Sequence, residues 1–95
     1  MTGHLSKIKL APRAIRDLKG LDRQTRKRVQ NAFQALETDA PNLDIKPVAG
    51  HVPWRRLRVG EHRVLYHELT DEPDARYLVA RVIDRRDLHR AIDKL

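Results

Sequence analysis

The sequence predicts an α+β domain in which helices cover an antiparallel sheet. Three observations lead to this prediction. Two segments in the first half carry apolar residues at helical spacing, three later segments alternate as strands do, and a last apolar stripe at helical spacing ends the chain. A chain of 95 residues sustains one hydrophobic core, so we expect a single domain spanning residues 1–95.

An N-terminal strand and a helical hairpin are predicted for the first part of the chain. Residues 6–10 alternate polar and apolar side chains and end before a proline that suits the first turn of a helix. Ile15 and Leu18 fall on one face of that helix. Asp22 is the predicted N-cap of a second helix, and the basic run at 26–28 is interpreted as its solvated face. The apolar stripe of the second helix is Val29, Ala32, Phe33 and Leu36.

A three-stranded antiparallel meander and a C-terminal helix are predicted for the rest. Residues 38–53 contain three prolines and a glycine, which predicts an irregular connection. Strands are expected at 54–59, 62–69 and 76–83, joined by a turn at Gly60-Glu61 and an acidic loop. We expect the helices to pack on one face of the sheet. The last helix, capped by Asp84, carries Leu88, Ala91, Ile92 and Leu95 on one stripe.

Composition and charge limit the classes of function. Lysine and arginine number 20 against 13 acidic residues, and the net charge of +7 favours a polyanionic partner such as nucleic acid. The lack of cysteine excludes disulfides and thiolate metal sites and favours a cytoplasmic protein. No apolar run approaches the ~20 residues of a membrane span. We therefore do not expect membrane association. The histidines show no metal-ligand spacing, so we expect neither a metal nor a cofactor.

The predicted strands place much positive charge on one face of the sheet. Alternation puts Arg56 and Arg58 on the same side of one strand, and Arg63 follows on the next. Because an unpaired guanidinium is costly to bury, that face must look onto solvent or an anion. From Arg55 to Arg90 there are nine arginines and no lysine, and the arginine fork matches phosphate oxygens. An ordinary polar face, with ion pairs to Glu61, Glu68 and Asp84, explains the pattern equally well.

Two segments resemble the RelE/ParE superfamily of toxins from bacterial type II toxin-antitoxin systems, and the RelE-like branch in particular. Residues 54–66 (WRRLRVGEHRVLY) follow its run of arginine, aliphatic, glycine, acidic and tyrosine positions, and residues 79–90 (VARVIDRRDLHR) follow its basic C-terminal segment. The likeness extends over the chain in length and element order. It implies a cytoplasmic, ribosome-dependent endoribonuclease, or mRNA interferase, that cuts mRNA and inhibits translation. It also implies a cognate antitoxin and a hetero-oligomeric toxin-antitoxin complex.

The resemblance and the chemistry of RNA cleavage together suggest the site residues. Metal-independent attack of a ribose 2′-OH on the adjacent phosphate needs a base, an acid and cations. Histidine titrates near working pH (~6.5), and the charges of Arg85 and Arg86 favour a neutral, proton-accepting ring. His89 is therefore the preferred acid or base, with Glu61 as the alternative base. The predicted transition-state stabilisers are Arg58, Arg63 and Arg85, and the predicted RNA contacts are Lys46, Arg56 and Arg86.

Two departures from the superfamily pattern keep other functions open. His62 stands where an aromatic residue is common, and His89 stands where many members have a tyrosine. One alternative is a ParE-like toxin directed at gyrase, whose activity would survive loss of His89. The other is a catalytically weak RNA-binding module. Trp54 and Tyr66 are interpreted as core residues rather than as base-stacking platforms.

Overall fold

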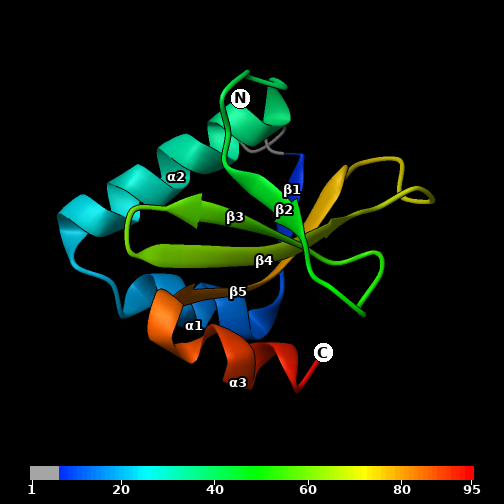
Figure 1. Ribbon diagram of the computed structural model, residues 1–95. Helices are drawn as coiled ribbons and strands as arrows, with labels where there is room; N and C mark the ends of the chain where they lie inside the picture. The colour runs from blue at the N-terminus through cyan, green and yellow to red at the C-terminus, as the bar shows by residue number, and fades with distance from the viewer. Residues whose placement is uncertain (1–6) are drawn as a thin grey trace.

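The predicted α+β architecture is confirmed by the structure, a computed structural model that describes residues 7–95 (Figure 1). Its first half contains strand β1 (Ile8–Leu10) and helices α1 (Pro12–Lys19) and α2 (Arg23–Glu37). A short strand β2 (Ile45–Pro47) precedes the meander of β3 (Arg55–Val59), β4 (His62–Glu68) and β5 (Tyr77–Asp84). The described chain ends with a 3₁₀ turn, η2 (Arg85–Asp87), and helix α3 (Leu88–Ile92). The start predicted for the first strand, Ser6, lies outside the described residues.

The five strands form one sheet in the order β1-β5-β4-β3-β2. The β3-β4-β5 meander is antiparallel as predicted, and β1 joins β5 in parallel. Strand β2 lies where an irregular connection was expected. Its three residues, ending in Pro47, are too few to show an alternating pattern, and it exists because Ile45 and Lys46 pair with Leu57 and Arg56 of β3.

The helices cover both faces of the sheet, so the expectation that they share one face was wrong for α3. Helices α1 and α2 pack with Val64 in the larger core cluster, whereas α3 packs with Leu65 and Ile83 in a second one. Figure 1 shows α3 in front of β5 and α1 behind it. The physical reason is the run of buried residues 64–66 on β4, because adjacent residues point to opposite faces and both faces then need an apolar cover.

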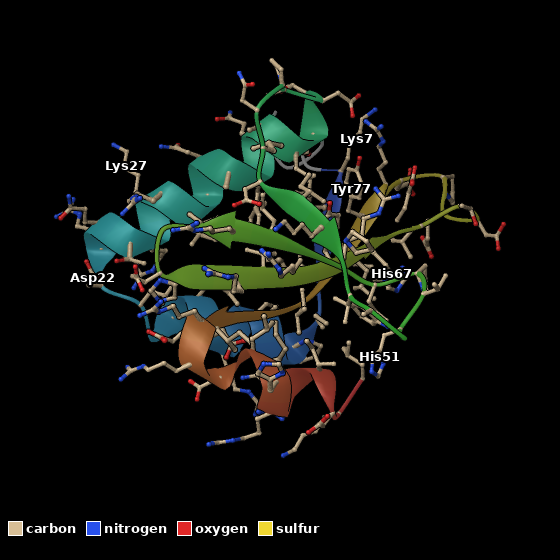
Figure 2. All side chains as sticks on the ribbon, in the orientation of Figure 1. Lys7, Asp22, Lys27, His51, His67 and Tyr77 are labelled. Atoms are coloured by element: carbon tan, nitrogen blue, oxygen red, sulfur yellow. The ribbon has the colours of Figure 1, made fainter. Side chains whose placement is uncertain are left out.

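The helical hairpin is held at its link by side chains. Asp22 caps α2 as predicted by accepting a hydrogen bond from the Thr25 backbone N–H at 3.3 Å. Arg26 donates to the carbonyls of Leu18 (3.0 Å) and Leu21 (2.8 Å), and so ties the start of α2 to the end of α1. Lys27 projects away from the sheet in Figure 2, as expected for a solvated position.

Helix α1 is fixed to the sheet through Asp17. Its carboxylate accepts from Arg81 Nε at 2.8 Å and from the Val82 backbone N–H at 2.9 Å, which satisfies a donor on β5. Ala14 is the fully buried residue of α1, while Ile15, predicted to share a helix face with Leu18, is 40% exposed. Within residues 7–95, no helix has the length and apolar character needed to span a membrane.

The core beneath α2 gives a stability prediction. Leu57 is 1% exposed at the centre of β3, so Leu57→Ala should lower the free energy of unfolding by about 2–5 kcal/mol through reduced burial and a cavity. Val52 is 90% exposed, and Val52→Ala should change it by less than about 0.5 kcal/mol. Urea unfolding of both variants tests this, and similar losses of stability for the two would contradict the described packing.

Candidate functional site

Four cationic residues share the face of the sheet on which α3 packs. In register across the strands, Arg56 pairs with Lys46 on one side and Leu65 on the other, and Arg58 pairs with Arg63. Cross-strand partners point to the same face. Leu65 lies in the cluster beneath α3. The structure thus brings together a basic surface beside α3, here called the arginine face: Lys46, Arg56, Arg58 and Arg63.

The β3–β4 turn orients two of these guanidinium groups. Gly60 adopts φ +59°, a conformation that favours glycine, and its carbonyl accepts from Arg63 Nη1 at 3.2 Å and Arg58 Nε at 3.4 Å. Arg63 Nη1 also donates to the His62 carbonyl at 3.0 Å. Both side chains are therefore drawn toward the turn, where their positive charges lie close together.

The 3₁₀ turn η2 brings a further arginine to the same place. The Arg85 backbone N–H donates to the Glu61 carbonyl at 2.9 Å, and Arg85 Nε forms an ion pair with Glu61 Oε1 at 2.8 Å. These two contacts fasten η2 to the β3–β4 turn. The Glu61 carboxylate is thereby engaged as the partner of a cation.

The electrostatics of Arg63 show how concentrated the positive charge is. Its pKa is lowered from the ordinary value, first by burial and then by the charges of Arg58, Arg56 and Arg85, while Glu61 opposes the change. Burial and the neighbouring arginines all disfavour the cationic form of Arg63, and an anion bound between these groups would offset that penalty.

The nearby carboxylates do not neutralise this face. Glu61 pairs with Arg85, and Asp84 pairs with Arg86 at 3.1 Å. Arg58 has one distant partner, Asp44, at 3.9 Å. Within residues 7–95, neither Arg56 nor Arg63 forms an ion pair with a carboxylate. The predicted alternative, in which acidic neighbours account for the arginines, therefore does not describe the centre of the face.

His89 lies at the other side of the arginine face. It is an exposed residue of α3 and lines a cavity together with Arg56, Leu88 and Ile92. Arg85 belongs to η2 and forms an ion pair with Glu61, whereas His89 belongs to α3 and lines the same cavity as Arg56.

The remaining predicted site and core residues lie as follows. Arg86 is bound to Asp84, and its side chain is 82% exposed. Tyr66 is 1% exposed, which confirms its interpretation as a core residue. Trp54 is half-buried, packs against the cluster beneath α3 and contacts His67 edge to face, with ring centroids 4.6 Å apart. Among residues 7–95, no three histidine or carboxylate side chains gather as a metal site requires.

Arg28 is a basic residue of this region that the sequence did not reveal. Its guanidinium nitrogens lie 3.1 and 3.3 Å from the point where a Cβ on Gly60 would stand. It therefore adds a cation beside the β3–β4 turn, although the run at 26–28 was interpreted as solvated. No spacing within α2 signals this contact, because it depends on how α2 crosses the sheet.

Comparison with known proteins identifies the family. Residues 8–89 match the family described as the ParE toxin of the type II toxin-antitoxin system, parDE. The chain belongs to this toxin family. The resemblance to the RelE/ParE superfamily inferred from residues 54–66 and 79–90 is thus confirmed at the level of the superfamily. No curated protein matches the sequence significantly.

Solved structures show that this ParE-family toxin has the RelE fold. It superimposes on a chain of the RelB-RelE antitoxin-toxin complex from Methanococcus jannaschii with a TM-score of 0.71 and 23% identity, covering 87% of this chain and 96% of that one. A chain of the archaeal RelE-RelB complex from Pyrococcus horikoshii OT3 gives a TM-score of 0.66 and 19% identity, with 83% and 93% covered. At these identities the likeness concerns the fold.

The cap of η2 gives a pH prediction. Hydrogen bonds from the Arg86 backbone N–H, and then from its side chain, hold the pKa of Asp84 below the ordinary value of 3.8. A carboxyl with a lowered folded pKa stabilises the fold fully above its unfolded pKa and loses that contribution as the pH falls through the folded pKa.

The stability difference between the wild type and Asp84→Asn should therefore shrink as the pH falls from neutral to below 3.8. Urea midpoints measured across this range test the prediction. A difference that stays constant with pH would show that the Asp84 charge does not stabilise η2.

Proposed function

We propose that this toxin inhibits translation in the cytoplasm by cleaving mRNA on the ribosome, with the arginine face as its phosphate-binding surface. One observation carries the proposal: Arg56 and Arg63 have no carboxylate partner within residues 7–95, and Arg63 has a lowered pKa among neighbouring cations. A site with this excess of arginine suits a phosphodiester, because the guanidinium fork matches phosphate oxygens in geometry and carries the opposite charge.

The reaction that fits the residues is internal transesterification. The ribose 2′-oxygen attacks the adjacent phosphorus, the bond from phosphorus to the 5′-oxygen breaks, and the products are a 2′,3′-cyclic phosphate and a 5′-hydroxyl. His89 takes the proton from the 2′-OH, and the leaving oxygen receives a proton from water. Glu61 is less suited as the base because its carboxylate is already engaged in an ion pair with Arg85.

The cations stabilise the negative charge that develops on the phosphorane. Arg58 and Arg63, held by the Gly60 carbonyl, and Arg85, held by Glu61, are oriented before substrate arrives, so little reorganisation is needed. Lys46 and Arg56 position the RNA backbone on the side of His89, and Arg86 adds a solvent-exposed contact. The ribosome supplies the alignment of mRNA with His89, which makes cleavage of free RNA slow.

A cognate antitoxin is proposed as the second partner. The solved neighbours were crystallised as antitoxin-toxin complexes, and this chain belongs to a type II toxin-antitoxin family. We propose a hetero-oligomeric complex in which acidic residues of the antitoxin cover the arginine face. Such a cover would block phosphate binding and explain neutralisation by charge complementarity.

A ParE-like action on gyrase is the second candidate, because the matched family is named for ParE toxins. In that case the protein acts as an interaction partner of the enzyme and needs no base. The two candidates therefore differ in their products, cut mRNA or broken DNA, and in their dependence on His89.

Primer extension of mRNA from a translating extract decides between them. The wild type should create new 5′ ends, and His89→Ala should lower the cleavage rate by about 10²–10⁴-fold because the base is removed. Arg63→Gln should lower it by about 10²–10³-fold because a charge that stabilises the phosphorane is removed.

His51→Ala is the matched control, because His51 lies in the loop before β3, outside the arginine face (Figure 2). This variant should cleave mRNA as the wild type does. Unchanged mRNA ends with the wild-type toxin would refute the nuclease proposal. DNA breaks in a gyrase assay that persist in His89→Ala would establish the second candidate instead.

A further inference from the structure

A cavity of about 250 Å³ lies between α3 and the end of β2, beside the arginine face. Its walls are mainly apolar, from Pro47, Val48 and Ala49 on one side and Leu88 and Ile92 on the other. It is smaller than the ~300–1,000 Å³ pockets that hold drug-sized ligands. Its size and walls therefore suit one flat, mostly apolar group.

Arg56 supplies the polar part of this cavity. Its Nη1 atom is buried and has no hydrogen-bond partner within residues 7–95. A buried guanidinium nitrogen without a partner is costly, and native proteins seldom keep one except where a ligand or water completes it. Because Arg56 lines the cavity, its guanidinium offers N–H donors to a ligand there that carries acceptor atoms.

The position of the cavity relates it to the RNA strand. Arg56 lies close enough to Arg63, a proposed phosphate-binding residue, for its charge to lower the pKa of Arg63. His89 lines the cavity as well, so the proposed base and the cavity lie side by side. A nucleotide whose phosphate lies on the arginine face would thus have its own base, or the next one, within reach of the cavity.

We propose that this cavity binds one nucleobase of the RNA strand and that Arg56 reads its acceptor edge. The N–H donors of a guanidinium match the O6 and N7 acceptors of guanine, whereas adenine presents a donor at N6. Single-stranded RNA is commonly recognised through such splayed bases. The inference rests on the proposed RNA binding and adds a base preference, guanine over adenine, at the site of cleavage.

Ligand titrations followed by NMR test the cavity without any cleavage. GMP should shift the backbone amides of Val48, Ala49 and Ile92 and bind several-fold more tightly than AMP. Ribose 5-phosphate, which lacks a base, should leave these amides in place. Equal affinities for GMP and AMP, or equal shifts with ribose 5-phosphate, would overturn the proposal.

A cavity-filling variant provides the matched comparison. Ala49 is exposed at the cavity wall, so Ala49→Leu should fill the space and remove the difference between GMP and AMP. Ala75→Leu, in the loop between β4 and β5, should keep that difference. If Ala49→Leu does not fold, the comparison of the three ligands on the wild type still decides.

Cleavage mapping separates this inference from the function on which it rests. Cut sites of the wild type should be enriched in guanine at one fixed position, and whatever cuts Ala49→Leu makes should lack that enrichment. Cutting without any base preference would overturn the cavity proposal alone. Selective GMP binding by a toxin that never cuts mRNA would overturn the nuclease proposal and leave the base cavity standing.

Discussion

The pairing of β3 with β4 is the constraint on which the structure depends. It sets Leu57 opposite Val64 and Arg58 opposite Arg63, so a single register sends apolar residues to the α2 side and cations to the other. A shift by one residue would bury the guanidinium groups and expose the core. The same pairing creates the turn whose Gly60 carbonyl gathers Arg58 and Arg63. Folding and the proposed binding surface thus have a common cause.

The sequence was sufficient for the meander, the hairpin and the Asp22 cap, because each depends on local periodicity or on a side chain next to the backbone it bonds. It was insufficient for β2, since three residues ending in Pro47 carry no alternation, and their pairing with β3 is set by the whole sheet. The place of α3 was missed for a related reason. Leu65 and Ile83 point away from α1 and α2 and need their own cover, which a stripe on α3 alone does not reveal.

For the candidate site, alternation along β3 and β4 was enough to group Arg56, Arg58 and Arg63 on one face. The partners of the charged groups were not predictable, because ion pairs depend on side-chain conformation. Glu61 holds Arg85 rather than an arginine of the sheet. Arg28 reaches the turn from a separate element, and the cavity beside Arg56 arises only when β2 and α3 come together. These features belong to tertiary packing.

The salt dependence of RNA binding tests the central claim, that guanidinium groups from neighbouring strands hold phosphates of a single RNA strand. For single strands, each phosphate that the protein neutralises adds about 0.7 to the steepness of log affinity against log salt. Arg56→Gln, Arg58→Gln and Arg63→Gln should each reduce the steepness by about that amount, and Arg23→Gln, on the exposed side of α2, should leave it unchanged. Equal changes in all four variants would contradict the account, because binding would then follow net charge and no site would exist.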